Sequence, residues 1–276
     1  MFSSCWPDME APEVEVLILN PGSKTYELPE FVKRMNRLKA LIVRNYRSFP
    51  TELTSGYQVM NCLSRLERIS LERISIPSFS NHNLKPLLHL KKLSFFMCKV
   101  DRAFTNCSIQ ISRVLPNLRE ISIDFCNDFV ALPIGLCEIA NLEKLSITNC
   151  HELSSLPEEL GKLINLKTLR LRSCIHLEKL PESISMLHEL VDLDISHCVG
   201  LTKLPDKIGN LQKLEKLNMW SCPIIRKLPA SLRNLKNLRS VVCEEEIAKW
   251  LDIVSPRLRN LVTEHKEEVN LDWLLA

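Results

Sequence analysis

The feature that most constrains the fold of this chain is a leucine that returns every 24 residues. These leucines are Leu118, Leu142, Leu166, Leu190, Leu214 and Leu238. Five of them open the pattern L-x-x-[IL]-x-[ILM]-x-x-C, as in Leu142, Leu145, Ile147 and Cys150. Self-similarity at a fixed period indicates a repeat architecture, in which each repeat buries its apolar side against its neighbours. The sequence therefore predicts one stacked body rather than two globular domains.

The same frame extends toward the N-terminus. Rungs that begin at positions 14, 38, 66 and 90 fit it, and the steps from 38 to 66 and from 90 to 118 each hold four extra residues. The predicted organisation is an N-terminal stub or partial cap at 1–13, about ten repeats at 14–243, mostly of 24 residues, and a C-terminal cap at 244–276. Because the stub is short, the first rung is expected to be covered by missing sequence or by a partner.

Each rung predicts one short strand and one turn on the opposite side. Side chains alternate along a strand, so positions 0, +3 and +5 of a rung point into the stack, and +2, +4 and +6 project outward. A Leu-Pro pair follows at +14 and +15, as in Leu156–Pro157, where proline suits the start of a helical or 3₁₀ turn. This pattern is typical of the leucine-rich repeat. The predicted fold class is α/β: a curved solenoid with a parallel sheet on the concave face and short helical or 3₁₀ turns on the convex face.

Eleven cysteines raise the question of disulfides or metal. Six of them share position +8 of a rung: Cys98, Cys126, Cys150, Cys174, Cys198 and Cys222. We interpret them as a structural ladder, because a small buried thiol can donate a weak hydrogen bond to loop backbone. Bridges between rungs are not expected, since the side chains run parallel and a cytosolic setting keeps thiols reduced. A redox or metal role is the minor alternative.

Motifs for catalysis, cofactors and metals are missing from the sequence. The seven histidines and eleven cysteines form no C-x-x-C or H-x-x-x-H spacing, and there is no G-x-x-x-x-G-K-[ST] phosphate loop. In Cys150–His151 and His197–Cys198 the cysteine points inward while its neighbour lies at the rim, so neither pair suits nucleophilic catalysis. We expect no enzyme activity and no cofactor.

The charge balance excludes several classes of partner. Thirty-six basic and 33 acidic residues leave no concentrated basic composition of the kind that favours nucleic acids or membrane surfaces. No apolar run approaches the ~20 residues of a membrane span. Residues 1–12 lack the pattern of a signal peptide, so the sequon at 106–108 is treated as chance. A cytoplasmic protein is expected, with the nucleus or the plasma-membrane periphery as alternatives for a full-length receptor.

Two sets of outward positions are candidate protein-binding surfaces. The polar set comprises Thr168, Arg170, Arg172, Asp192, Asp194, Lys216, Asn218 and Trp220, with Trp220 as anchor because Trp and Arg dominate binding energies. Its alternative interpretation is a solvated face whose opposite charges neutralise each other across rungs. The apolar set comprises Val16, Ile18, Ala40 and Ile42. These residues could form an interface or could pack against the N-terminal stub.

The repeats also resemble a known family. They read LP-x-x-[IL]-x-x-L-x-x-L-x-x-L-x-[IL]-x-x-C at 156–174 and 180–198, like the cytosolic repeats of plant NLR immune receptors, and they lack the Gly-x-Ile-Pro element of secreted plant receptors. Three stretches extend the resemblance: APEVEVLILN at 11–20 with LPEFVKRMNRLKALIV at 28–43, ISIDFCNDFVALPIGLCEIANLEKLSITNCHELSSLPE at 121–158, and EEVNLDWLLA at 267–276. They are similar to the C-terminal region of helper NLRs, in particular the subclass required by the tobacco N receptor.

This resemblance implies a non-enzymatic module for partner recognition and autoinhibition in innate immune signalling. The implied partners are a lipase-like immune signalling heterodimer and a nucleotide-binding domain. The family's membrane-disrupting and nucleotide-binding domains are not in this sequence, so pore formation and nucleotide exchange are not assigned to it. Two alternatives stay open: a truncated paralogue that competes for the partner and damps signalling, and a general cytosolic leucine-rich repeat scaffold.

Overall fold

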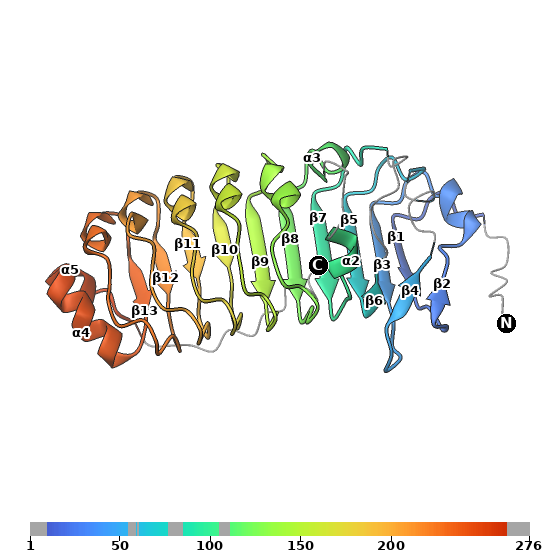
Figure 1. Ribbon diagram of the computed structural model, residues 1–276. Helices are drawn as coiled ribbons and strands as arrows, with labels where there is room; N and C mark the ends of the chain where they lie inside the picture. Colours follow the sequence, from blue (N-terminus) through green and yellow to red (C-terminus); the bar gives the residue numbers. More distant parts are fainter. Residues whose placement is uncertain (1–9, 55–58, 60, 77–84, 105–110, 264–276) are drawn as a thin grey trace.

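The computed structural model describes residues 10–54, 59, 61–76, 85–104 and 111–263, which form an elongated stack of parallel strands (Figure 1). Over these residues the main sheet has ten strands in the order β1-β3-β5-β7-β8-β9-β10-β11-β12-β13. Their bounds are β1 Val16–Leu19, β3 Ala40–Arg44, β5 Arg68–Glu72, β7 Lys92–Phe96, β8 Glu120–Asp124, β9 Lys144–Thr148, β10 Thr168–Arg170, β11 Asp192–Asp194, β12 Lys216–Asn218 and β13 Ser240–Val242. Successive strands pair in parallel with each position of one rung opposite the same position of the next. The predicted fold class is confirmed.

The turns on the side opposite the sheet are short 3₁₀ helices. They are η1 Glu30–Arg34, η2 Ile134–Glu138, η3 Glu158–Lys162, η4 Glu182–Met186, η5 Ile208–Asn210 and η6 Ala230–Asn234. A proline directly precedes five of them: Pro29, Pro133, Pro157, Pro181 and Pro229. The φ of proline is fixed near the helical value and the first turn needs no N–H, so each of these five Leu-Pro pairs starts a 3₁₀ turn. Leu204–Pro205 is the exception, because η5 begins three residues later, at Ile208. The longer step from 90 to 118 instead holds two single-turn α-helices, α2 Asp101–Phe104 and α3 Ile111–Val114.

A second, narrow sheet runs along the edge of the first rungs. It has three parallel strands in the order β2-β4-β6: β2 Thr25–Tyr26, β4 Thr51–Leu53 and β6 Ile74–Ser75. Single bridges such as Ala131↔Ser155 and Lys179↔Lys203 continue this edge in later rungs. The sequence pattern did not predict these strands, because two or three residues are too few to show a period.

The core lies between the sheet and the 3₁₀ turns and is continuous from rung to rung. Leu142, Leu145 and Ile147, at positions 0, +3 and +5 of one rung, are at most 1% exposed, and the same positions of other rungs join one apolar cluster. Burial of one such side chain contributes about 1.5–3 kcal/mol. Since most of that surface is covered by neighbouring rungs, a rung is stable only within the stack.

The strand ends in a left-handed residue at position +7 of seven successive rungs. These residues, all with φ between 52° and 58°, are Arg73, Met97, Phe125, Asn149, Ser173, His197 and Ser221. The left-handed conformation costs roughly 1–2 kcal/mol for a residue with a Cβ, so the surrounding rungs must hold it. In each of these rungs the backbone thus turns out of the strand one residue before position +8.

The far end of the stack is closed by a helical segment. Helix α4, Glu245–Val254, and the single turn α5, Pro256–Arg259, follow β13, and Val262 bridges in parallel to Val241. The guanidinium of Arg257 donates to the carbonyl oxygens of Leu235, Lys236 and Leu238 at 3.1, 2.9 and 3.2 Å. Trp250 of α4 is 44% exposed, so it contributes less to this closure than its size suggests. Residues 1–9 and 264–276 of the two predicted caps lie outside the described residues.

Charged side chains at position +1 form a column along one edge of the main sheet, which we term the charged edge column: Glu15, Lys39, Glu67, Lys91, Arg119, Glu143, Lys167, Glu215 and Arg239. Its ion pairs include Glu67–Lys91 at 2.9 Å and Glu143–Lys167 at 2.7 Å. Hydrogen bonds from these lysines lower the pKa of Glu67 and of Glu143. Such exposed pairs contribute little energy each, but they favour this order of rungs.

Candidate interaction surface on the outward face of the sheet

The outward face of the main sheet carries three rows of side chains, at positions +2, +4 and +6. The central row begins with Ile18 and Ile42 and then holds four serines, Ser70, Ser94, Ser122 and Ser146, which we term the serine row. Arg170, Asp194 and Asn218 continue it. The two outer rows hold most of the face's charged and aromatic side chains. The central row is therefore apolar at one end, small and polar in the middle, and charged toward the C-terminal end.

The predicted polar set lies together at that charged end. Residue pairing places Thr168 beside Asp192, and Asp192 beside Lys216. Arg170 lies opposite Asp194, with 3.7 Å between its Nε and Oδ2 of the carboxylate. Both side chains are mostly buried, at 19% and 15% exposure. Part of the charge is therefore neutralised within the sheet, as the alternative interpretation expected, while Lys216 stays exposed.

Trp220 follows β12 at the outward position +6 and is only partly exposed. Its backbone is fixed on both sides, because its N–H donates to Oδ1 of Asn218 at 3.1 Å and its carbonyl accepts the N–H of His197 at 2.7 Å. Asp194 repeats this arrangement one rung earlier, where Oδ1 accepts the N–H of Ser196 at 3.0 Å. A backbone held in this way presents the indole in a defined position at little entropic cost.

The predicted apolar set is only half open. Val16 and Ile18 of β1 are 55% and 58% exposed, whereas Ile42 of β3 is 9% exposed and Ala40 is intermediate. Pairing places Ile18 directly beside Ile42, so the inner strand is sheltered while the edge strand is open. All four side chains occupy outward positions, but Ile42 is buried. The described residues therefore present a smaller apolar surface, centred on Val16 and Ile18.

The six cysteines at position +8 lie buried in one line. Each thiol donates to a backbone carbonyl of the preceding rung, at sulfur-to-oxygen distances from 2.8 Å for Cys198 and Leu171 to 4.0 Å for Cys126 and Phe95. All six are free thiols. Burial raises the pKa of Cys98 and of Cys150 to about 12. Such thiols stay protonated and unreactive at neutral pH.

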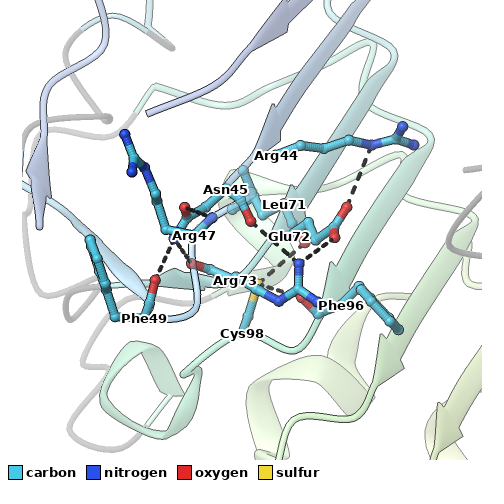
Figure 2. A network of polar contacts seen from close by, with 9 residues as sticks. All are labelled: Arg44, Asn45, Arg47, Phe49, Leu71, Glu72, Arg73, Phe96 and Cys98. Atoms are coloured by element: carbon cyan, nitrogen blue, oxygen red, sulfur yellow. Dashed lines mark hydrogen bonds and ion pairs between the residues drawn. The ribbon is translucent and has the colours of Figure 1, made fainter. Parts of the chain in front are cut away.

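Sequence reasoning did not single out a polar network near the N-terminal end (Figure 2). Glu72, 8% exposed, lies between Arg44 at 3.6 Å and Arg73 at 3.2 Å. Asn45, fully buried, donates to the carbonyl of Phe49 at 2.6 Å and to that of Arg73 at 3.3 Å. Arg44 and Glu72 occupy position +6 of adjacent rungs. This shared position is the sequence feature that could have predicted their ion pair. Glu72 offsets one of the two arginine charges, and Asn45 holds the loop that contains Phe49, as expected of a structural role.

A second buried carboxylate lies on the +6 row. Asp124 is 2% exposed, and its Oδ1 accepts hydrogen bonds from Oγ1 of Thr148 at 2.6 Å and from Nδ2 of Asn149 at 2.8 Å. Over the described ranges, no group of three or more His, Cys, Asp and Glu side chains is placed to hold a metal ion. In the same part of the chain, no helix is long and apolar enough to cross a membrane.

Comparison with known proteins shows what the chain is similar to. Residues 135–263 match a family described as leucine-rich repeat region. Two probable disease resistance proteins of Arabidopsis thaliana are 41% and 44% identical over 132 and 140 residues, which are 48% and 50% of this chain. Disease resistance protein ADR1 of the same plant is 37% identical over 127 residues, or 46% of the chain. The matched segments span only 16–17% of these relatives' own lengths.

Solved structures agree with the fold. The leucine-rich repeat domain of the type III effector XopL superposes with a TM-score of 0.69 at 23% identity, over 86% of this chain and 79% of that one. The plant peptide hormone receptor RGFR1, solved in complex with RGF2, gives 0.50 at 18% identity, over 87% of this chain and 42% of that one. At these identities the likeness concerns the fold alone. The chain is a leucine-rich repeat solenoid, and about half of its length is similar to plant disease resistance proteins.

Proposed function

We propose that this chain is the non-enzymatic interaction module of a plant disease-resistance protein of the helper NLR type, acting in cytoplasmic immune signalling. The observation that carries the proposal is 41–44% identity, over about half of the chain, to proteins named for disease resistance. The match is closer to these relatives than to ADR1, at 37%. The finer placement, in the subclass required by the tobacco N receptor, rests on the resemblance of residues 11–43, 121–158 and 267–276.

The proposed partner surface is the charged end of the outward face, from Arg170 to Trp220. It combines an exposed cation, Lys216, with partly exposed Arg172 and Trp220, residue types that contribute strongly to protein interfaces. The proposed partner is a lipase-like immune signalling heterodimer. The resemblance to helper NLRs supports this partner, and rigid strands place the charges of the surface at fixed spacing, which favours specific over general binding.

Substitution of Trp220 by alanine should weaken binding of this heterodimer by about 2 kcal/mol, or roughly 30-fold in Kd. Isothermal titration of the purified chain measures this. Because Trp220 is partly buried, Lys216→Glu, at an exposed position, serves as a second variant that leaves packing intact. Ile253→Ala, on α4 at 75% exposure, is the matched control and should bind like the parent chain. Unchanged affinity in both surface variants would remove this end of the sheet from the interface.

A second contact is proposed between Val16 and Ile18 and the nucleotide-binding domain of such a receptor, where it would support autoinhibition. The support is that these two side chains are more than half exposed on an open edge strand. Substitution Ile18→Asp should abolish measurable binding of the separately purified domain, because a carboxylate would be desolvated in an apolar contact. Thermal unfolding should be unchanged, since Ile18 is not part of the core. Retained binding would show that the two molecules meet elsewhere.

A further inference from the structure

A single serine-proline pair lies at the joint between the two helices that close the far end of the stack. Helices α4 and α5 lie side by side at that end (Figure 1), and Ser255 connects them. Of the 15 prolines in the sequence, Pro256 alone follows a serine or a threonine. The repeat explains the Leu-Pro pairs, because they recur at one position of each rung. It does not explain Ser255–Pro256, which lies beyond the last rung.

The side chain of Ser255 has no part in holding this joint. A serine before a helix usually caps it, with its Oγ accepting a backbone N–H of the first turn. Within the described chain, Ser255 makes no such side-chain bond to α5. The joint uses its backbone instead: its N–H donates to the carbonyl of Leu251 at 2.8 Å, and its carbonyl accepts the N–H of Leu258 at 2.9 Å. Alanine would supply both bonds equally well, so the hydroxyl group needs another explanation.

The backbone around Ser255 has the form that a protein kinase binds. Kinases hold their substrates as extended segments, and Ser255 is extended, with φ −169° and ψ 123°. It is partly exposed, Pro256 is exposed, and Ile253 is 75% exposed. Proline has no backbone N–H, so it fits a substrate groove that offers no acceptor there, whereas other residues would leave an N–H unpaired. The single turn of α5 opens at small cost, which lets the segment enter such a groove.

We propose that Ser255 is a phosphorylation site of a proline-directed protein kinase, and that the phosphate loosens α4 from the last rung. In the transfer, the hydroxyl oxygen of Ser255 forms a bond to the γ-phosphorus of ATP, and the bond from that phosphorus to its bridging oxygen breaks. ADP leaves, and the hydroxyl proton passes to the catalytic aspartate of the kinase. The joint then carries up to about two negative charges that it did not have before.

The added charge acts against α4 in two ways. Ser255 is the C-cap residue of α4, where the helix dipole is negative, and the last turn of α4 holds Asp252 and no basic residue. A phosphate in this place is repelled. The phosphate also competes for Arg259, four residues on, whose Nη2 lies 2.9 and 3.1 Å from the two carboxylate oxygens of Glu245. Since arginine binds phosphate in strong charge-assisted bonds, the contact between α5 and the first turn of α4 is lost.

Helix α4 also fixes the charged end of the outward face. Its side chains Ile247 and Leu251 are buried against the stack. Glu244, directly before the helix, accepts the N–H of Ser221 through Oε1 at 2.5 Å. Ser221 has a left-handed φ of 58° and directly follows Trp220. Movement of α4 therefore releases the N–H of Ser221 and loosens the backbone that presents Trp220. The phosphate is in this way a control on the outward face that does not depend on the identity of any partner.

The first test is the phosphorylation of the full chain with ATP and a purified mitogen-activated protein kinase, followed by mass spectrometry of the peptide that contains Ser255. Phosphate should accumulate on Ser255, and this peptide should stay unmodified in Ser255→Ala. In Pro256→Ala it should accumulate at least about tenfold more slowly. Ser255→Ala should unfold at the parent's temperature, which excludes a folding defect as the cause. Absence of phosphate on Ser255 of the folded chain would overturn the proposal, and so would equal rates in the parent and Pro256→Ala.

The second test is hydrogen exchange of the phosphorylated chain against the unmodified one. Peptides from residues 245–254 and the peptide that contains Ser221 should exchange at least about tenfold faster after phosphorylation, because both then open locally. Peptides from β9, far from the joint, are the internal reference and should not change. Ser255→Ala treated with the same kinase controls for other sites and should exchange like the unmodified parent. Unchanged exchange in a fully phosphorylated chain would show that the phosphate does not act on α4.

Discussion

Raising the pH from 9 to 10 should lower the free energy of unfolding of this chain by several kcal/mol. Burial raises the pKa of Cys98, Cys137, Cys150 and Cys243 to about 12, from an ordinary value of 9.0. Because the folded pKa lies above the unfolded one, this stabilisation is fully present below pH 9 and is lost as the pH rises toward 12. Between pH 9 and pH 10 each thiol contributes a loss of about 1 kcal/mol, and the four together about 4 kcal/mol. A loss of this size is a large part of the whole stability of many domains.

Urea unfolding at a series of pH values, under reducing conditions, measures this effect. The matched variant is Cys98→Ala with Cys150→Ala, which removes two of the titrating thiols. The free energy of unfolding of this variant should be lower at neutral pH. It should also fall less steeply as the pH rises, and the difference in slope should correspond to about two protons. An identical slope in the parent and the double variant would show that the buried thiols do not cause the alkaline loss.

Replacement of Gly209 by alanine should destabilise the chain by about 3 kcal/mol or more. A Cβ at this position would lie 2.0 Å from the backbone carbonyl oxygen of Ser231 in the next 3₁₀ turn. A backbone group cannot move aside as a flexible side chain can, so η5 and η6 would have to separate. The close approach also carries a hydrogen bond of 3.2 Å from the N–H of Gly209 to Oγ of Ser231, which separation would break.

Two other glycines provide a graded comparison. At Gly161 the added Cβ would lie 2.7 Å from the carbonyl oxygen of Ser183, and at Gly22 it would meet nothing within 4 Å. Thermal unfolding should therefore rank the alanine variants Gly22, Gly161 and Gly209 in order of increasing loss, with the first close to the parent chain. If Gly209→Ala unfolds at the same temperature as Gly22→Ala, contact between successive 3₁₀ turns is not what limits side-chain size there.

The period of 24 residues was sufficient to predict the architecture. It placed each rung's leucines in the core and proline at the start of five 3₁₀ turns, since both follow from alternation along a strand and from the fixed φ of proline. It could not predict the left-handed residues at position +7. Met97 and Phe125 stand there, and neither residue type indicates that conformation; the stacking of rungs imposes it.

The candidate surfaces were harder to predict than the fold. Sequence position identifies which side chains point outward, and Arg170, Asp194 and Trp220 do lie on one face. It does not give their exposure, because exposure depends on what neighbouring rungs place beside them. For this reason the burial of Ile42 and of Ser146 did not follow from their outward positions. The residue type does not help either, because other isoleucines and serines of this sequence are exposed.

The charged edge column has a consequence for how an array of this kind can gain or lose repeats. Deleting the rung that begins at 142 would bring Arg119 next to Lys167, and duplicating it would put Glu143 next to its own copy. Like charges directly opposed on neighbouring strands destabilise a sheet. Unequal crossing-over should thus be tolerated best at breakpoints that leave anion beside cation. The order of positive and negative charges along this edge would therefore limit which numbers of repeats are retained by selection.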